Sequence, residues 1–412
     1  MALRGNACIG QSGGPTSVIN ATMVGAVEAA RDIDAIERFY GAVHGLQGVL
    51  DENLVDLFRE DPEVLAALRY CPSAAIGSVR LKPQDQHLAR VMEVFKAQNI
   101  RYFFYNGGND SQLTCHLISE LAKSSDWEMC IIGVPKTIDN DLVITDHCPG
   151  FGSAARYAAA AVQFVARDSE AFGNPHVVEV MGRHAGWLTA ATGIGAVAPG
   201  DAPHLVYVPE VPVTREQFVE DVAQHFQQWG TCVVAASEGF KFAGEDEFRV
   251  SDKVDAFGHV RLGGVAQGLS DIIEEAGIAK RCRNDKLGNL QRCFAWAASE
   301  TDLEEAYAVG REAAVRAARG ETDVMITIER ESDEPYRWEC GATSLVSVAD
   351  QTKLVPSEWL NEQANGIGEQ MRRYVVPLIQ GRTFQMEPGL PRYPKLARHY
   401  VGKQLPPYAP SK

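Results

Sequence analysis

The residues best suited to chemistry lie in the run Val-Pro-Lys-Thr-Ile-Asp-Asn-Asp, from Val134 to Asp141. Asp139 and Asp141 are separated by one residue, so on an extended segment their carboxylates project to the same side and could hold a metal ion and an acceptor hydroxyl together. Lys136 adds a cation where negative charge builds up on a phosphoryl group in transfer. Taken alone, however, a charged loop after an apolar strand is more often a solvated turn.

Four further segments combine glycine turns with polar or cationic side chains. They are Ser12-Gly13-Gly14-Pro15-Thr16, Gly107-Gly108-Asn109-Asp110-Ser111, Met181-Gly182-Arg183 and Leu287-Gly288-Asn289-Leu290-Gln291-Arg292. In order and spacing, these segments and the acidic run resemble the phosphofructokinase family over roughly residues 6–330. Several motifs in the right context are far more specific than any one of them.

The resemblance implies that Asp139 is the general base that withdraws a proton from the C1 hydroxyl of fructose 6-phosphate, with Lys136 as a second catalytic residue. Arginines suit a phosphate because their planar fork donates two hydrogen bonds, although an isolated arginine more often forms a surface salt bridge. By the same resemblance, the residues expected to bind the sugar phosphate are Thr137, Met181, Gly182, Arg183, Glu238, Arg283 and Arg292.

At the donor end, Gly13, Gly14 and Arg80 match family positions that touch the transferred phosphate, although Arg80 lies in a polar turn and could equally be structural. Relatives that use ATP generally carry glycine in place of Asp110 and Lys136, whereas those that use pyrophosphate carry Asp and Lys. The chain therefore looks closest to the pyrophosphate-dependent 6-phosphofructokinases. A carboxylate at Asp110 would repel the α-phosphate of a nucleotide. The structural alternative is that Asp110 caps a helix beginning at Ser111.

The expected cofactor is Mg²⁺, with Asp110, Asn109 and Asp141 as candidate ligands. Asn109 stands where the family usually has an aspartate, and its amide oxygen lowers the ligand charge that attracts Mg²⁺. Two more departures concern the sugar and the assembly. Asn289 replaces a usual histidine or aromatic residue, and Asn174 replaces an arginine that in many relatives reaches into a neighbouring subunit.

The implied activity is the reversible transfer of a phosphoryl group from pyrophosphate to the C1 hydroxyl of fructose 6-phosphate, giving fructose 1,6-bisphosphate and phosphate. Three alternatives stay open. The first is an ATP-dependent 6-phosphofructokinase, and the second is a pyrophosphate enzyme for another sugar phosphate such as sedoheptulose 7-phosphate. The third, prompted by Asn109, is a catalytically silent subunit that regulates a partner.

Composition limits the partners and the location. The 39 basic and 54 acidic side chains give a net charge of −15, which argues against nucleic acid. The 9 cysteines are scattered without a Cys-x-x-Cys pair, as expected for reduced thiols in the cytoplasm. No segment has the length of a signal peptide core or a membrane span. The symmetry usual in the family makes a homo-oligomer, by default a dimer, the expected assembly.

Short apolar runs alternate with helical patterns, which predicts an α/β fold of two Rossmann-like domains with mostly parallel sheets flanked by helices. The active site is expected in the cleft between them, since ligands gather at the carboxyl ends of parallel strands. Residues 1–147 plus about 293–350 are expected to form the phosphoryl-donor domain, and 148–292 plus part of 351–385 the sugar-phosphate domain. We also expect an insertion at 241–280, a helical stretch from Ser357 to Tyr374, and an extended tail at 386–412.

Overall fold

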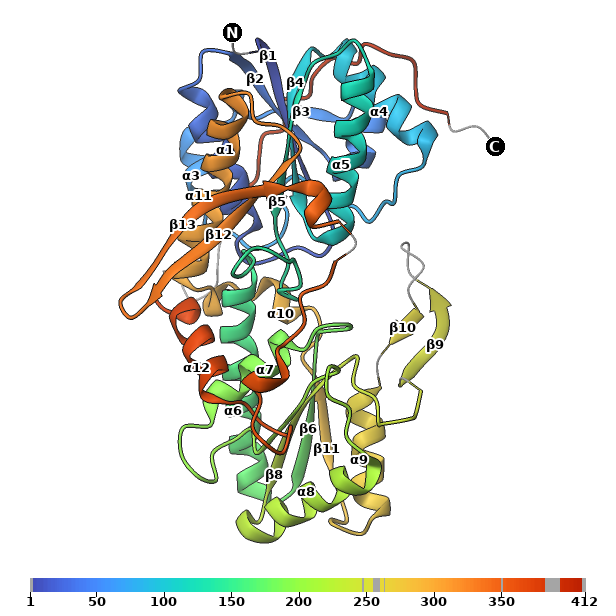
Figure 1. The fold of residues 1–412 in the computed structure, drawn as a ribbon, viewed down its shortest axis with the longest axis vertical. Helices are drawn as coiled ribbons and strands as arrows, with labels where there is room; N and C mark the ends of the chain where they lie inside the picture. The colour runs from blue at the N-terminus through green and yellow to red at the C-terminus, as the bar shows by residue number, and fades with distance from the viewer. Residues whose placement is uncertain are drawn as a thin grey trace.

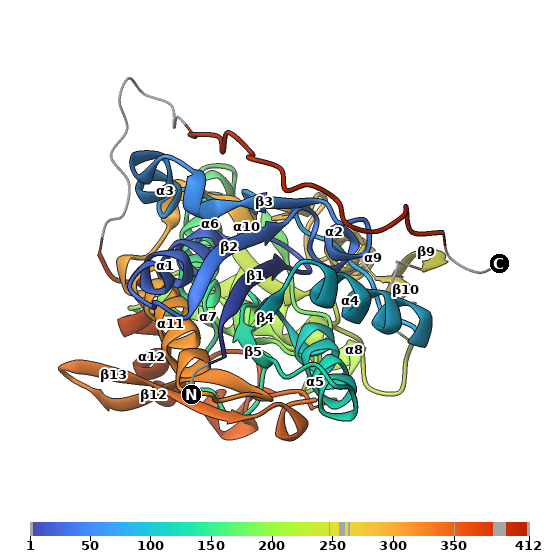
Figure 2. The same cartoon turned by 90° about the horizontal axis from the view of Figure 1, so that it is seen from above.

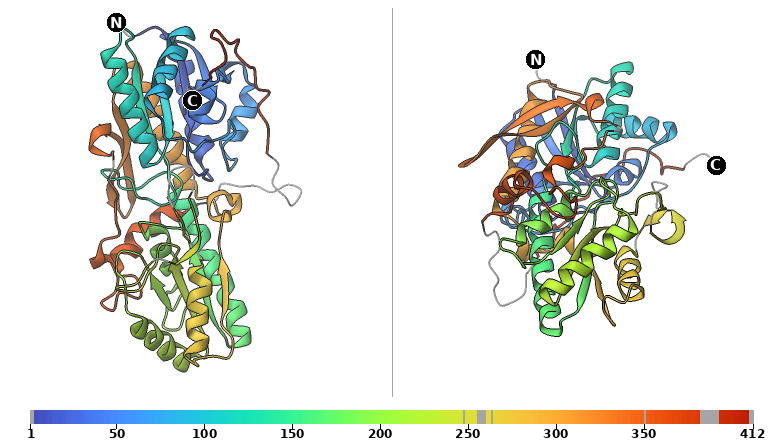
Figure 3. Two further views of the ribbon diagram at one scale, coloured as in Figure 1. Left: turned by 90° about the vertical axis from the view of Figure 1, so that its right-hand side faces the viewer. Right: turned by 60° about the horizontal axis from the view of Figure 1, so that its bottom comes forward.

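The computed structural model describes residues 3–246, 248–254, 260–262, 264–349, 351–381 and 393–409. It has two α/β lobes, which lie one above the other in Figure 1. The left view of Figure 3 shows the elongated outline, with the blue and cyan first lobe above the green and yellow second lobe. Within the described part of the chain, every helix is too short or too polar to span a lipid bilayer.

The first lobe is built on a 7-stranded sheet in the order β13-β12-β5-β4-β1-β2-β3. Its inner strands are parallel, whereas β3 and β13 run antiparallel at the two edges. The strands are β1 (Gly5–Gln11), β2 (Ile36–Ala42), β3 (Leu54–Asp56), β4 (Ile100–Gly107), β5 (Cys130–Pro135), β12 (Val324–Asp333) and β13 (Tyr336–Ser344). The helices are α1 (Ile19–Arg31), α2 (Gly45–Leu50), α3 (Pro62–Leu68), α4 (Asp85–Ala97), α5 (Asn109–Ser124) and α11 (Glu300–Ala318).

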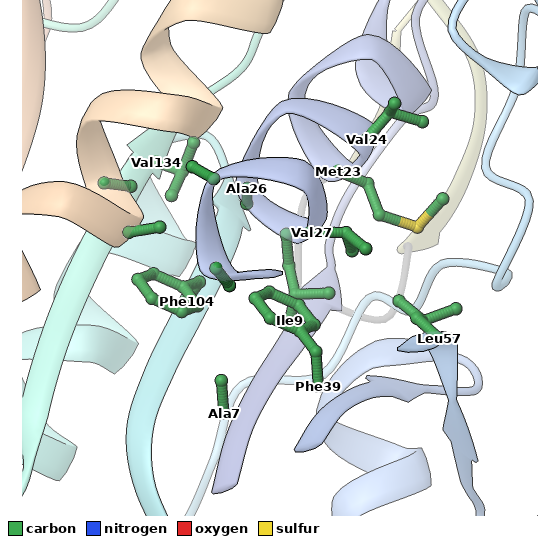
Figure 4. Close-up of a cluster of buried hydrophobic side chains, with 14 of the residues drawn as sticks. Ala7, Ile9, Met23, Val24, Ala26, Val27, Phe39, Leu57, Phe104 and Val134 are labelled. Carbon is green, nitrogen blue, oxygen red and sulfur yellow. The ribbon is translucent and has the colours of Figure 1, made fainter. Parts of the chain in front are cut away.

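Both faces of this sheet are buried, which explains the nearly continuous apolar runs of its central strands. On β1, Ile9 faces the side covered by α1 and α11, whereas Cys8 faces the side covered by α4 and α5. Figure 2 shows these helices on the two sides of the sheet. Figure 4 shows Val27 of α1 beside Ile9, with the ring of Phe104 nearby. This packing fixes the loops that follow β1, β4 and β5 at one edge.

The second lobe has a 4-stranded parallel sheet in the order β11-β6-β8-β7. Its strands are β6 (Pro175–Val180), β7 (Leu205–Tyr207), β8 (Cys232–Ser237) and β11 (Arg283–Lys286), and a separate hairpin pairs β9 (Arg249–Val254) with β10 (Val260–Leu262). The helices are α6 (Phe151–Phe172), α7 (Trp187–Thr192), α8 (Arg215–Trp229), α9 (Val265–Glu275), α10 (Leu290–Cys293) and α12 (Glu369–Val375). The chain returns to this lobe after the hairpin β12–β13, as shown by the bond from Val206 N–H to Asn365 O at 2.8 Å.

Two sequence expectations for this part need correction. The stretch 241–280 is not an insertion throughout, because α9 buries Val265 and Leu269 in the core of the second lobe and connects β8 to β11. The stretch from Ser357 to Tyr374 is not one helix. It contains a 3₁₀ turn at Ser357–Trp359 and resumes as α12 only after Gly368, with Gly366 in the intervening turn.

The expected tail at 386–412 is only partly described, because residues 382–392 and 410–412 lie outside the described residues. Residues 393–409 run along the first lobe, as the red trace in Figure 2 shows. The tail extends the sheet edge at β3, since Asp56 N–H donates to His399 O and Val401 N–H donates to Leu54 O, both at 2.9 Å. This stretch of the tail is therefore docked on the first lobe.

Candidate active site

A cavity of about 230 Å³ lies where loops of the two lobes face each other. Its walls combine glycine backbone, carboxylates and cations. The lining residues are Ser12, Gly13, Gly14, Arg80, Gly108, Asn109, Asp110, Ser111, Lys136, Thr137, Asp139 and Asp141 from the first lobe, and Met181, Arg183, His184, Glu238 and Arg292 from the second lobe and the segment that follows it. All five sequence motifs thus contribute to one cavity.

The turn after β1 brings backbone close to two cations. The ammonium of Lys136 donates to Gly14 O at 2.7 Å. A Cβ on Gly14 would lie 2.8 Å from Nε of Arg292, so a larger residue would push this arginine away. Burial lowers the pKa of Lys136 to about 8, and the neighbouring positive charge of Arg292 acts in the same direction.

The acidic loop begins where β5 ends. Thr137 Oγ1 accepts a hydrogen bond from Asp139 N–H at 3.0 Å, and Asn140 turns the chain with a φ of 56°. Both carboxylates line the cavity. Burial, together with the charge of Asp139, raises the pKa of Asp141 to about 6. The loop therefore concentrates negative charge in a partly desolvated place.

The start of α5 faces this loop. Asn109 Nδ2 donates to Asp141 Oδ2 at 3.0 Å, whereas Asn109 Oδ1 and Asp141 Oδ1 are buried with no partner among the described residues. Two such oxygens on side chains in contact, with Asp110 on the same cavity wall, fit a hard divalent cation. The capping alternative for Asp110 is wrong, because α5 begins at Asn109 with Gly108 as its N-cap and no side chain caps it.

The second lobe contributes the turn after β6 and the residue after β8. Gly182 has a φ of 140°, which favours glycine, and its carbonyl accepts from the hydroxyl of Ser237. Arg183 and Glu238 then reach the cavity. Burial raises the pKa of Glu238, and the charge of Asp139 adds to this shift across the cavity. Gly182 itself does not line the cavity but shapes the turn.

Arg292 lies on the short helix α10, where its Nη1 donates to Asn289 Oδ1 at 3.2 Å. The preceding Gln291 accepts from Met181 N–H at 3.0 Å and so ties this helix to the turn after β6. The hydroxyl of Ser17, in the first lobe, donates to Arg292 O at 3.3 Å. Gln291 lies within the motif Leu287–Arg292, but the sequence assigns it no role, since a hydrogen bond to a backbone group leaves no sequence signal.

The expectation that Arg283 binds the sugar phosphate needs correction, because the structure does not bring Arg283 to this cavity. Arg283 is the first residue of β11 and pairs in register with His176 at the start of the parallel strand β6, whereas Met181 follows the end of β6. Its guanidinium forms an ion pair with Asp168 and lies 4.2 Å from the ring centre of Phe172. The two ends of a parallel strand pair lie on opposite edges of a sheet.

His184 is a lining residue to which the sequence assigned no chemistry. The sequence signal for His184 is its position directly after the motif Met181-Gly182-Arg183. Ser12, Gly108 and Ser111 also line the cavity, and all three lie inside motifs that the sequence identified without a separate role for them.

Known proteins are similar to this chain over nearly its whole length. The model of the family described as phosphofructokinase matches residues 6–315. A pyrophosphate--fructose 6-phosphate 1-phosphotransferase of Halomonas elongata is 42% identical over 98% of this chain and 99% of its own, and one of Methylococcus capsulatus is 42% identical over 98% and 99%. The crystal structure of a pyrophosphate-dependent phosphofructokinase from Marinobacter aquaeolei superimposes with a TM-score of 0.90 at 39% identity, covering 99% of this chain and 100% of that one. The chain therefore belongs to the phosphofructokinase family.

Proposed function

We propose that this protein reversibly transfers a phosphoryl group from pyrophosphate to the C1 hydroxyl of fructose 6-phosphate, giving fructose 1,6-bisphosphate and phosphate. The observation that carries the proposal is that Lys136, Asp110 and Asp139 line one cavity with arginines from the other lobe. Lys136 and Asp110 are the side chains expected for an inorganic donor, and relatives covering nearly the whole chain bear that activity in their names.

In this proposal Asp139 is the general base for the sugar hydroxyl, and the ammonium of Lys136 neutralises charge on the transferring group. Gly13, Gly14 and Arg80 contact the donor. Opposite them, Arg183 and Arg292 bind the sugar phosphate, Glu238 accepts from sugar hydroxyls, and Thr137, Met181 and Gly182 complete the sugar side.

Enzymes of the phosphofructokinase family generally use a divalent metal ion. We assign Mg²⁺ to Asp141, Asn109 and Asp110, because two unpartnered buried oxygens of this group suit a hard cation. When bound, Mg²⁺ would supply positive charge to the donor phosphates. Asn109 contributes a neutral ligand, so the affinity for metal depends more strongly on the ionisation of Asp141.

The decisive test is a coupled assay of the purified protein with Mg²⁺ and either pyrophosphate or ATP, with fructose 6-phosphate and sedoheptulose 7-phosphate as acceptors. We expect turnover with pyrophosphate in both directions, a preference for fructose 6-phosphate, and little turnover with ATP. Turnover with ATP alone would refute the donor. Binding of the sugar phosphate without turnover would favour the silent regulatory subunit.

Asp139→Asn tests the base in the same assay. We expect kcat to fall by at least about 10²-fold, because the amide cannot accept the proton. Asp126→Asn is the control, since Asp126 is exposed and forms an ion pair only with Lys96 among the described residues. A rate near wild type for Asp139→Asn would show that another group is the base.

We further propose a homodimer in the cytoplasm. In support of the dimer, the exposed side chains Phe164 (75%) and Phe172 (61%) lie along α6. Exposed apolar side chains on one element favour association. In support of the location, all 9 cysteines are free thiols. Light scattering during size-exclusion chromatography measures the assembly.

A further inference from the structure

The loop that carries Asp139 and Asp141 is held from behind by groups that the proposed reaction does not use. Asn140, between the two carboxylates, is completely buried and adopts a left-handed conformation with a φ of 56°. Its Nδ2 donates to the hydroxyl of Tyr374 at 2.8 Å, and its Oδ1 accepts from Cys148 N–H at 3.0 Å. Because its neighbours turn with it, whatever fixes Asn140 also fixes the directions of both carboxylates.

Lys353 adds a cationic contact to the same loop. Its ammonium donates to Asp146 O at 2.7 Å, to Thr145 O at 3.3 Å and to Asn140 Oδ1 at 3.4 Å. Its backbone N–H also donates to Asp141 O at 2.8 Å. One residue therefore holds the loop at both ends, through its side chain and through its backbone.

Lys353 and Tyr374 both come from the segment 351–381, which packs on the second lobe. Trp187, the first residue of α7, donates from Nε1 to Lys353 O at 2.8 Å, and the Lys353 ammonium lies 5.2 Å from the ring centre of Trp187. Helix α7 follows directly on the turn that carries Arg183. The segment 351–381 thus connects the acidic loop of the first lobe to the sugar-facing turn of the second.

We propose that Lys353 and Tyr374 are positioning residues for phosphoryl transfer, which direct Asp139 and Asp141 through Asn140. This inference rests on the proposed function, in which Asp139 is the base and Asp141 a metal ligand. Neither positioning residue lines the cavity, so both act through the loop and not on the substrate. Groups that orient metal ligands or catalytic side chains typically contribute about 10- to 100-fold.

The first test is steady-state kinetics of Lys353→Met and Tyr374→Phe. We expect Lys353→Met to lower kcat by about 10- to 100-fold, while KM for fructose 6-phosphate changes less than about twofold. Tyr374→Phe should lower kcat less, because the Cys148 and Lys353 contacts to Asn140 stay. The double variant should lose less than the product of the two effects, since both residues act on Asn140. Lys353→Arg, which keeps a cation near the same carbonyls, should recover part of the rate.

Arg372→Met is a matched control. Arg372 lies in the same C-terminal segment and donates to the carbonyl oxygens of Ile194 at 2.8 Å, Gly193 at 3.3 Å and Ala196 at 2.6 Å, all within the second lobe. Its loss removes a comparable set of contacts between a cation and backbone carbonyls without touching the acidic loop. We expect Arg372→Met to lower Tm about as much as Lys353→Met but to leave kcat within about twofold of wild type.

Binding of Mn²⁺ in the absence of substrates, measured by electron paramagnetic resonance, is a readout that needs no turnover. We expect Lys353→Met to raise the Kd for Mn²⁺ by about tenfold or more, and Arg372→Met to leave it unchanged. The inference is overturned if Lys353→Met leaves both kcat and the Kd for Mn²⁺ within twofold, or if Arg372→Met changes them equally. A wild-type protein without turnover refutes the proposed function, and the Mn²⁺ comparison then decides the positioning role alone. A wild-type protein that also fails to bind Mn²⁺ overturns both.

Discussion

Lys136 is a cation whose charge depends on pH in the working range. Burial and the charge of Arg292 lower the pKa of its ammonium to about 8. Above that pH, the side chain of Lys136 in the free protein is a neutral amine beside Gly14. The phosphates of the pyrophosphate donor then lose one source of charge neutralisation. We therefore expect kcat/KM for pyrophosphate to fall as pH rises through about 8, in a profile measured from pH 6 to 10.

Lys136→Arg identifies the group responsible for this alkaline limb. A guanidinium stays charged throughout the range, so the variant should be slower but its profile should be flat above pH 8. An alkaline limb that persists in Lys136→Arg would assign the titration to a different group.

Substitutions of Asp110 test whether the charge of its carboxylate determines the choice between pyrophosphate and ATP. Removing its carboxylate with Asp110→Gly should raise kcat/KM for ATP by about tenfold or more and lower that for pyrophosphate, because the repulsion of a nucleotide phosphate is gone. Asp110→Asn removes the negative charge but keeps the size of the side chain, so it separates the effect of charge from the effect of side-chain volume. Glycine in the first turn of α5 costs up to about 1 kcal/mol, so Tm is measured alongside. An unchanged ratio of the two donors in both variants would exclude Asp110 as a determinant.

For individual residues, the sequence predicts the site best where a motif follows directly on a strand. The turns at Gly13-Gly14 and Met181-Gly182-Arg183 and the acidic run all reach one cavity, because each follows the end of a parallel strand. Arg283 lies in none of the five motifs, and the sequence alone does not reveal at which end of β11 it stands. Lys353 gave no signal at all, since its partners are backbone carbonyls distant in sequence.

Among the helices, α1 and α11 cross so closely that each needs a glycine. A Cβ on Gly310 would lie 1.9 Å from Thr22 O, and one on Gly25 would lie 2.1 Å from Tyr307 O. Both obstacles are backbone, so the helices would have to separate. We expect Gly310→Ala to lower the free energy of unfolding by about 1–3 kcal/mol in urea titrations, despite the better helix propensity of alanine.

Gly402→Ala is the control for this prediction, because a Cβ added to Gly402 would have no heavy atom within 4 Å apart from its own residue and chain neighbours. Its effect should stay within about 0.5 kcal/mol. Because α1 follows the turn at Gly13-Gly14, displacement of the helix should also lower kcat in Gly310→Ala. Equal stability of Gly310→Ala and wild type would show that the crossing tolerates a methyl group.

The elements themselves were predictable to different degrees. Strands β1, β4 and β5 stand out as apolar runs. The sequence predicts them at Ala7–Gly10, Arg101–Tyr105 and Met129–Val134, within about two residues of their bounds in the structure. The pairing of β12 with β13 was missed, because β13 alternates half-buried and exposed residues at a sheet edge and has no apolar run. The sequence predicts α9 only as part of an insertion, since its apolar face can be assigned to the core only once the sheet that it covers is known.

At the scale of the whole molecule, a buried cluster of charged side chains around His147 connects the first lobe to the second. His147 lies between carboxylates, with Nδ1 2.7 Å from Asp146 Oδ1 and Nε2 2.6 Å from Glu305 Oε2. Arg330 contacts Asp146 Oδ1 at 2.9 Å and donates to the carbonyl of Tyr374 in the second lobe at 3.1 Å. Burial alone would lower the pKa of His147, but Glu305 and Asp146 raise it to about 9.

This raised pKa predicts how the stability of the junction depends on pH. The folded state holds the proton more tightly than the unfolded chain, so the stabilisation is complete below about pH 6.5 and is lost as pH rises through about 9. Between pH 6.5 and 8 the loss amounts to about 2 kcal/mol. The difference in unfolding free energy between wild type and His147→Gln should shrink by that amount over this window. His204→Gln is the control, because burial lowers the pKa of His204 to about 4 and keeps it neutral throughout. The contradicting outcome is a difference in unfolding free energy between wild type and His147→Gln that stays constant with pH, together with a neutral His147 in the folded protein. In that case the ion pairs would not hold the lobes together at neutral pH. Packing around Tyr374 would have to supply that stability.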